Sequence, residues 1–513
     1  MGVIANLWRL ARTAATFQRT GAMAEALEAL DAPRSVRVAA RVLGWPLSPL
    51  GLAGDPSLPP APRALTARGP GYVKFGQVLS TRPDVAGDKI ARDLRVLQDR
   101  LAPFPVEEAR AQVAHELGRT VDEIFSEFGP AVAAASIAQV HPAVERETGR
   151  KVAVKVLRPG VERAFRKDVD AFWFIAKTIE VLSPSSRRLR PRAVIAHFEG
   201  VVMTELDLRL EAAAAAEFRA NTAADDGFAV PEVLWAHSAR RVMTLEWVDG
   251  DPLGDVDLLA ARGHDLVPLG AFIIRSFLRH ALRDGFFHAD MHQGNLKLAR
   301  DGTLIALDFG IMGRIDPYTR RVYAEILLGF LRRDYRRVAE VHFEAGYVPA
   351  DRDLEAFAQA LRSIGEPIFG QDASHISMAR LLAHLFDVTE RFGMETRTEL
   401  ILLQRTMVVV EGVARTLDPN LNMWRASQPV VEDWMKDNLG PRAMRRDLAA
   451  TAMVLSRFGP RVPEMAERAL KRLAEGGDPA PVPRGPGAAA LVAAALGAGL
   501  VGGVAGAAAV LLL

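Results

Sequence analysis

The sequence contains no cysteine among its 513 residues. That absence excludes disulfide bonds, thiolate catalysis, and zinc or iron–sulfur centres held by cysteine. A strong excess of one charge is also missing, because 64 basic and 62 acidic side chains leave a formal net charge of +2, and we expect no nucleic-acid partner. Apolar residues make up 49% of the chain, which favours two or three globular domains, or one two-lobed enzyme with extensions.

Long apolar runs are scarce. Arg9, Arg12 and Arg19 interrupt the apolar residues at the N-terminus, so no secretory signal is evident. The exception is the stretch from Ala488 to Leu513, which has no charged or polar side chain. As a helix it would be about 39 Å long, more than the roughly 30 Å of a bilayer's hydrocarbon core. We therefore expect a transmembrane anchor at 488–513.

The flanks of this stretch indicate its orientation. Lys471, Arg472 and Arg484 precede it, which favours a catalytic body on the cytoplasmic side. A composition rich in alanine, arginine and glycine is typical of a GC-rich bacterial genome, so the expected location is a bacterial inner membrane. A hairpin of two spans and a buried or disordered Ala/Gly tail remain alternatives to the single span.

The N-terminal 50 residues have apolar side chains at helical spacing, among them Leu7, Leu10 and Phe17. Such an amphipathic helix either packs on the rest of the protein, which we favour, or lies on a membrane. Residues 51–70 are rich in proline and glycine and are interpreted as a linker. A second helical stretch follows and carries Lys74-x-Gly76-Gln77.

The most informative feature is the spacing of three side chains. Asp290 is followed by Asn295 five residues later and by Asp308, within Asp-Phe-Gly, eighteen residues later. Protein kinases use this arrangement: one carboxylate orients the attacking hydroxyl, while an amide oxygen and a second carboxylate hold Mg²⁺ on the phosphates of ATP. An Asp/Asn-rich turn is the alternative, and the offset argues against it. His288 is expected to support the loop through its imidazole.

A lysine suited to phosphates stands upstream. Residues 131–141 and 151–156 look like strands separated by a turn at 147–149, and Lys155 lies in the second. Kinases place a lysine there to hold the α and β phosphates and pair it with a carboxylate on a helix. Glu205, Asp207 and Glu211 are the candidates in the helical region 163–220, and the residues alone do not choose among them.

The usual glycine-rich phosphate loop is missing. Where it should precede the lysine strand, the chain has Ala133, Ala134, Ala135 and Ser136. Glycine lets backbone amides approach phosphates closely, so the nucleotide geometry should differ from that of an ordinary protein kinase. At the other edge of the expected site, a strand at 241–247 ends near Glu246 and Val248, which we also expect to contact the nucleotide.

Together these motifs resemble the UbiB/AarF family of atypical kinases over roughly residues 60 to 430. The resemblance rests on Lys74-x-Gly76-Gln77, the loop at 133–136, Glu205-x-Asp207, the run from His288 to Asn295, and Asp308-Phe309-Gly310. It implies an α+β, two-lobed, protein-kinase-like fold with an N-terminal helical extension. It also implies ATP binding, ATPase activity, and a role in the biosynthesis of ubiquinone or other prenyl lipids.

The resemblance also assigns roles to residues. Lys155 would hold phosphates with Glu211 as its partner, and Lys74 and Gln77 would cover the site, with Glu205 and Asp207 near Lys74. A covered cleft disfavours a peptide substrate. Two absences agree, because His288-Ala289-Asp290 lacks the arginine that reads a phosphorylated activation loop, and no Ala-Pro-Glu follows Gly310.

The sequence therefore predicts a membrane-anchored kinase or ATPase using ATP and Mg²⁺. Expected partners are the membrane, prenyl-lipid or phenolic quinone precursors, and quinone-biosynthesis enzymes. A nucleotide-gated scaffold and a small-molecule or protein kinase are the alternatives. The expected parts are an amphipathic helical region at 1–50, a helical extension at 51–115, an N-lobe at 116–250, a C-lobe at 251–475, a linker at 476–487 and the anchor at 488–513.

Overall fold

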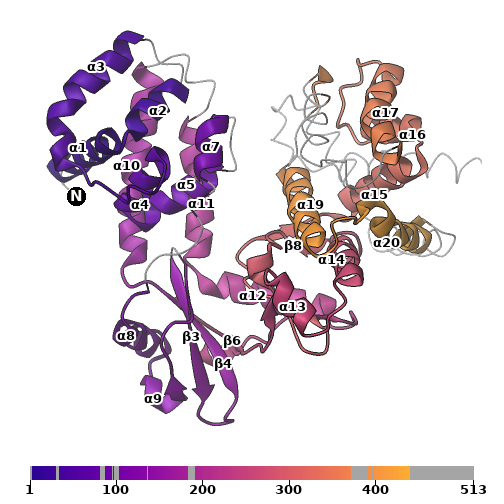
Figure 1. Ribbon diagram of the computed structural model, residues 1–513, viewed down its shortest axis with the longest axis horizontal. Coiled ribbons are helices and arrows are strands. Elements are labelled where there is room, and N and C mark those ends of the chain that lie inside the picture. The colour runs from indigo at the N-terminus through magenta and orange to yellow at the C-terminus, as the bar shows by residue number, and fades with distance from the viewer. Residues whose placement is uncertain are drawn as a thin grey trace, which may run out of the picture. The chain divides into compact units, whose positions relative to one another are not determined.

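A computed structural model describes residues 3–29, 34–80, 87–94, 96–97, 103–135, 137–182, 191–370, 388, 391–394 and 398–439 (Figure 1). The chain divides into one compact unit of residues 1–435 and a second unit of residues 436–513. Apart from residues 436–439, all of the described residues belong to the first unit.

The described residues before position 95 are mostly in helices that pack on one another. Their bounds are α1 Val3–Thr20, α2 Ala22–Ala29, α3 Arg34–Gly44, η1 Trp45–Leu50, α4 Pro60–Arg68, α5 Pro70–Ser80 and α7 Asp88–Leu94. The hydroxyls of Thr13 on α1 and Tyr72 on α5 share a hydrogen bond of 3.0 Å, and Ala15 and Thr16 are buried. Helix α1 therefore packs on the protein body.

The interpretation of residues 51–70 as a linker is wrong for its second half. Residues Pro60–Arg68 form α4, which packs on α1 and α5 and buries Ala64 and Leu65. The prolines do not prevent the helix, because Pro60 occupies the first helical position, where no backbone N–H is needed. The proline signal marked a helix start.

A five-stranded antiparallel sheet comes next in the chain. Its elements, with the helices beside it, are α8 Val106–Leu117, α9 Val121–Ile124, β1 Phe125–Phe128, β2 Ala133–Ala134, β3 Ala138–Glu145, β4 Lys151–Leu157 and β6 Val242–Glu246. The strand order is β1-β3-β4-β6, with β2 paired to β3. Alternate residues of β4 point to opposite faces. Val152, Val154 and Val156 pack with Ala109 and Val113 of α8, which lies beside the sheet in Figure 1. Lys155 therefore faces the other side.

Long α-helices follow β4 in the chain before β6. They are α10 Val161–Leu182, α11 Pro191–Glu205 and α12 Leu208–Thr222. Phe172 of α10 stacks on Phe75 of α5 with ring centroids 4.6 Å apart and meets Phe198 of α11 edge-on. This aromatic contact fixes the N-terminal helices against α10 and α11.

The next part holds the loops of the candidate site. Its elements are β5 Phe228–Ala229, η3 Trp235–His237, β7 Asp251–Pro252, α13 Val256–Ala261, α14 Leu266–Arg279, η4 His280–Asp284, β8 Phe286–His288, η5 Gln293–Asn295, β9 Leu296–Leu298, β10 Leu304–Ala306 and β11 Met312–Arg314. The small sheets have the orders β5-β10-β9-β7 and β11-β8. The carboxylate of Asp225 bonds His280 and Arg283 in the turn before β8. Although burial opposes the charge, these two partners hold the pKa of Asp225 well below its usual range.

Helices complete the described part of the chain. They are α15 Pro317–Arg332, α16 Tyr335–Glu344, α17 Leu354–Gly370, α19 Thr398–Leu417 and α20 Met423–Leu439. Helix α19 packs along α14, and Leu403, Met407 and Val410 join the main core. The expected linker at 476–487 and anchor at 488–513 lie outside the described residues. Within the described part of the chain, no helix combines the length and apolarity needed to cross a bilayer.

Candidate active site

Lys155 is the centre of the site. It lies on β4, opposite Val140 of β3 and Met243 of β6, so strands flank it on both sides. Its Nζ is 2.6 Å from Oε1 of Glu211 and 3.3 Å from Oδ2 of Asp308. Burial opposes its charge, but the two carboxylates outweigh that effect and raise the pKa of Lys155 above its usual value. The lysine therefore remains a fixed cation.

Glu211 reaches Lys155 from the first turn of α12. Of the three carboxylates that the sequence offered as partners, it is the one in contact with the lysine. Its side chain is buried, and this burial raises its pKa while Lys155 lowers it. The pair joins the sheet to α12 by a charge-assisted hydrogen bond.

The loop after β8 carries Asp290. His288 organises this loop: its Nδ1 accepts a hydrogen bond from the Asp290 backbone N–H, and its Nε2 donates to the carbonyl of Leu307, each at 3.1 Å. These roles require the neutral tautomer with the proton on Nε2. Burial lowers the pKa of His288, which agrees with the neutral form. The expected supporting role of His288 has a direct geometric basis.

Asn295 ties the same loop to the Asp-Phe-Gly segment. Its side-chain amide nitrogen donates to the backbone carbonyl of Asp290 at 3.0 Å, and its backbone carbonyl accepts the Leu307 N–H at 2.8 Å. Its amide oxygen has no hydrogen bond to any residue in the described ranges, so it can serve as a ligand. Asn295 therefore lies next to Leu307, the residue before Asp308.

Asp308 has a left-handed backbone with φ of 56°. Its Oδ1 accepts the Gly310 N–H at 3.1 Å, which stabilises this conformation. Burial acts to raise the pKa of Asp308, but Lys155 and the Gly310 N–H dominate and lower it to about 2. Phe309 is buried between His288 and Phe218 of α12, with ring centroids 5.7 and 6.1 Å away.

The donor set suits a magnesium–nucleotide complex. Mg²⁺ prefers hard oxygen ligands and is usually held by one or two carboxylates together with substrate phosphates. Asp308 supplies an ionised carboxylate and Asn295 an amide oxygen, and Lys155 lies within reach of the same carboxylate. These residues would hold Mg²⁺ and the phosphates of ATP.

Lys74 forms a second ion pair close to the first. Its Nζ is 2.7 Å from Oε1 of Glu205, which ends α11. Burial raises the pKa of Glu205, Lys74 lowers it, and the charges of Asp308 and Lys155 also act on it. The pair is thus within electrostatic reach of the phosphate lysine.

Gln77 and Gly76 of the Lys-x-Gly-Gln segment make contacts that require these residue types. Gln77 donates its amide N–H to the carbonyl of Leu97 at 2.9 Å. A Cβ on Gly76 would be 2.5 Å from a methyl of Leu97 and 2.6 Å from one of Leu65. Helix α5 can pack this closely only with glycine at position 76.

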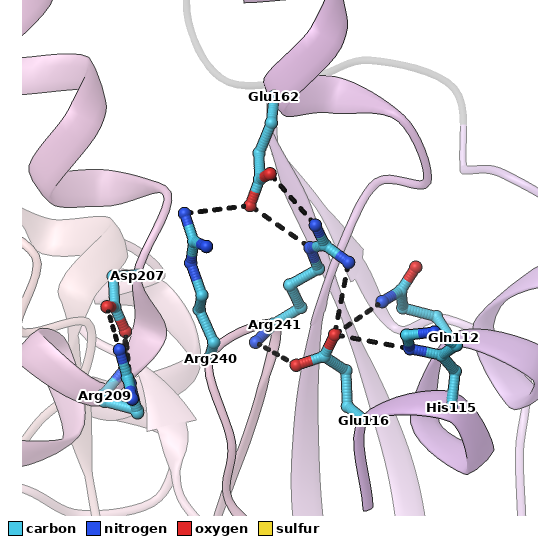
Figure 2. A network of polar contacts seen from close by, with 8 residues as sticks. All are labelled: Gln112, His115, Glu116, Glu162, Asp207, Arg209, Arg240 and Arg241. Atoms are coloured by element: carbon cyan, nitrogen blue, oxygen red, sulfur yellow. Dashed lines mark hydrogen bonds and ion pairs between the residues drawn. The ribbon is translucent and has the colours of Figure 1, made fainter.

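The side chain of Asp207, which the resemblance places near Lys74 with Glu205, makes its contacts with Arg209. It caps α12, with Oδ1 accepting the Arg209 N–H at 3.1 Å, and its carboxylate pairs with the Arg209 guanidinium at 2.6 Å (Figure 2). These hydrogen bonds lower its pKa. An aspartate directly before a helix is a strong N-cap signal, and that local role determines its position.

The start of α12 is held by a larger polar network (Figure 2). The guanidinium of Arg241 contacts Glu116 of α8 at 3.3 Å and Glu162 of α10 at 2.9 Å. Arg240 contacts Glu162 at 3.4 Å and its carbonyl accepts the Leu208 N–H at 2.9 Å. The network links α8, α10 and the α12 N-terminus, which lies one turn before Glu211.

The alanine loop is a hairpin. Residues 131–141 do not form one strand as expected: Ala133 and Ala134 pair with Val140 and Gln139, and the Ala135 N–H donates to Ala138 at 2.8 Å. The chain reverses between β2 and β3, a turn that no glycine, proline or asparagine signalled. Ser136 lies outside the described residues.

Glu246 and Val248 lie at the end of β6. The Glu246 carboxylate accepts the Glu232 N–H at 3.2 Å and is 3.6 Å from Arg150, so its side chain is occupied elsewhere. The Val248 carbonyl accepts a hydrogen bond from Lys297 at 3.4 Å. A contribution of Glu246 to nucleotide binding would have to come from its backbone.

Helix α19 contributes residues that the sequence did not reveal. The Thr406 hydroxyl donates to the carbonyl of Ala289 at 3.1 Å, directly before Asp290. Burial lowers the pKa of the neighbouring Arg405, and the charge of Asp290 acts against that shift. Both residues follow the loop by more than a hundred positions and belong to no local motif, so only the fold could identify them.

The comparisons with known proteins agree with this geometry. Residues 96–342 match the ABC1 atypical kinase-like domain and residues 361–422 the UbiB helical domain. The chain is 38% identical over 439 residues to the probable protein kinase UbiB of Marinobacter nauticus, covering 84% of this chain and 80% of that protein. The chain belongs to the UbiB family of atypical kinases.

A further relative supports the UbiB assignment, and a solved structure supports the fold. The probable protein kinase UbiB of Edwardsiella ictaluri is 39% identical over 414 residues, covering 80% of this chain and 76% of that protein. The solved structure of the Rv3197–erythromycin complex from Mycobacterium tuberculosis has a TM-score of 0.50 and 26% identity, covering 72% of this chain and 92% of that one. The resemblance to the UbiB family and the kinase-like mixed fold are thereby confirmed.

Proposed function

We propose that this UbiB-type chain is a membrane-anchored atypical kinase or ATPase that uses Mg-ATP to support ubiquinone or other prenyl-lipid biosynthesis. The observation that carries the catalytic part is the contact of Lys155 with both Glu211 and Asp308. It is the arrangement in which kinases hold the phosphates of ATP. The proposed membrane anchor rests on the sequence of residues 488–513. The division of the chain into six parts and its location in a bacterial inner membrane belong to the same proposal.

The residues divide the chemical work. Lys155 binds the α and β phosphates, and Glu211 orients it. Asn295 and Asp308 would hold Mg²⁺, which would supply positive charge against the phosphate oxygens. Asp290 accepts the hydrogen bond of the attacking hydroxyl or water, on a loop that His288 and Asn295 keep in place.

The acceptor is a water molecule or a small phenolic lipid precursor rather than a peptide. Lys74 and Glu205 lie within electrostatic reach of Lys155, and α5, which carries Lys74 and Gln77, packs on α10. A helix in that position restricts access by an extended chain. This steric argument favours ATPase or small-molecule transfer over protein phosphorylation.

The test is Mg²⁺-dependent ATP hydrolysis by the full-length chain in lipid nanodiscs, with and without anionic lipid and a phenolic quinone-precursor mimic. Asp308→Asn and Asp290→Asn should each lower the turnover number at least 100-fold, the loss expected when a charge-stabilising group is removed. Asp301→Asn is the matched control, because Asp301 is an exposed carboxylate in the β9–β10 turn. Equal turnover in Asp308→Asn and the control would refute the catalytic assignment.

A nucleotide-gated scaffold and a kinase are the alternatives. The scaffold predicts that Asp290→Asn restores quinone synthesis in cells that lack the protein, whereas the ATPase predicts no rescue. A kinase predicts transfer of the labelled γ phosphate to a lipid or protein acceptor. The chain carries Asp290 beside the phosphate-binding and metal-binding side chains, and this complete set favours the catalytic function over the scaffold, which would not need Asp290.

A further inference from the structure

An exposed apolar face lies on α3 and η1, far along the chain from the candidate site. Val38, Val42 and Trp45 are 61, 63 and 75% exposed, and Leu50 is half exposed. Val38, Val42 and Trp45 follow one another at intervals of four and three residues, which places them on one side of a continuous helical segment. Large apolar side chains exposed singly are common, but four within thirteen residues form a patch.

The same segment is strongly basic. Arg34, Arg37 and Arg41 are exposed on α3, and no acidic residue occurs between Arg34 and Leu50. Arg34 and Arg41 are three or four residues from Val38 and Trp45, so arginines and large apolar side chains share the exposed side of the segment. Helices that lie in a lipid interface combine these residue types. Tryptophan also prefers the headgroup level of a bilayer.

The segment packs against α1, chiefly through η1 and the residues that follow it. The Arg19 guanidinium donates to the carbonyl of Gly51 at 2.8 Å, and the Leu52 N–H donates to the Thr16 hydroxyl at 3.1 Å. A Cβ on Gly51 would lie only 2.3 Å from the carbonyl of Ala15, so the backbones are in close contact. The patch is therefore displayed by a fixed element, at the edge of the N-terminal helices (Figure 1).

We propose that α3 and η1 form a peripheral docking surface for an anionic lipid bilayer, the four apolar side chains entering the interface and the three arginines meeting lipid phosphates. Charge complementarity selects this occupant: a second copy docked on the same face would bring six arginines together, which is unfavourable. The contact requires neither ATP turnover nor the segment 488–513. It would hold the N-terminal helices, including α5 with Lys74, at the membrane surface.

The absence of cysteine makes the test specific. A nitroxide on Val42→Cys in the full-length chain reports its depth in vesicles of phosphatidylcholine alone or mixed with phosphatidylglycerol. Val267→Cys is the matched control, since Val267 is 57% exposed at the start of α14. The label at position 42 should become accessible to oxygen and protected from an aqueous relaxant in the anionic vesicles, and the label at 267 should remain aqueous.

A charge variant completes the experiment. Replacing Arg34, Arg37 and Arg41 by Gln should lower the partition ratio of the position-42 label about 100-fold, because each arginine at an anionic surface contributes about a fivefold change. The proposal is overturned if the label stays aqueous on anionic vesicles. Two results in lipid-free protein would also overturn the proposal. Spin–spin broadening would show that a second copy of the chain covers this face. A label that is already shielded from the aqueous relaxant, without broadening, would show that another part of the same chain covers it. ATPase activity is not measured, so failure here leaves the proposed function standing.

Discussion

The Lys74–Glu205 ion pair allows a quantitative test of how α5 is held against α11. We expect Lys74→Met to leave the Glu205 carboxylate without its cation while keeping most of the aliphatic volume. The two side chains are 15 and 13% exposed and 2.7 Å apart, so the pair is largely removed from water. Removing one partner of a buried pair costs about 3–5 kcal/mol, and the remaining solvent contact points to the lower end, about 3 kcal/mol.

The loss should depend on pH. Burial already raises the pKa of Glu205 above its usual value, so its contribution to stability is greatest at low pH and is lost as the pH rises through the folded-state pKa. Without Lys74, which lowers this pKa, the carboxylate is harder to ionise in the folded protein. Lys74→Met should therefore be more destabilising at pH 8 than at pH 5.

Hydrogen exchange of the α5 backbone amides measures the local opening free energy. A loss of about 3 kcal/mol corresponds to exchange about 150-fold faster after correction for intrinsic rates. Adding Glu205→Gln should recover about 2 kcal/mol, because the double variant no longer buries an unpaired charge. A loss that is independent of pH, or a double variant no better than Lys74→Met, would contradict this reasoning.

Three further predictions concern packing, the phosphate lysine and acid stability. Gly76→Ala should destabilise the protein by about 1–3 kcal/mol in thermal unfolding, because the new Cβ meets Leu97 at 2.5 Å. Gly200→Ala in α11 is the control: its new Cβ would have no atom within 4 Å, so it should stabilise the protein by about 0.5–1 kcal/mol. Glu211→Gln should reduce kcat/KM for Mg-ATP about 100-fold while the protein remains folded, because Lys155 loses the partner that orients it. Burial lowers the pKa of His288, so the neutral side chain stabilises the folded protein above pH about 6.5. This contribution is lost as the pH falls through the folded-state pKa. Denaturant titrations of the wild type and His288→Gln should therefore differ more at pH 8 than at pH 5.

Much of the site could be predicted because its chemistry is local in sequence. Asp290, Asn295 and Asp308 occur within nineteen residues, and the backbone bond from Leu307 to Asn295 brings the two loops together. Lys155 could be placed because it lies in a short strand-like segment upstream of the Asp-Phe-Gly region, where kinases carry their phosphate lysine. The choice of Glu211 needed the family resemblance, since three carboxylates on a helix look equivalent in sequence.

The errors have physical causes. The strand expected at 131–141 spans the loop that the resemblance placed at 133–136, and the reversal at Ala135 rests on a backbone hydrogen bond. Proline at position 60 breaks a helix interior but favours a helix start, so composition alone misassigned α4. Arg405 and Thr406 approach Asp290 through the packing of α19 on α14, a long-range contact with no local signature.

The corner between α11 and α12 has a further consequence when its charges are counted. Glu205 and Glu211 are six residues apart, and together with Asp308 they surround Lys74 and Lys155. Three carboxylates thus face two ammonium groups, and the pKa values of both glutamates are raised. A phosphate chain approaching this cluster meets an excess of negative charge, so positive charge has to arrive with it. Nucleotide affinity should accordingly be thermodynamically linked to the uptake of cations, and the slope of log Kd against log cation concentration would count them.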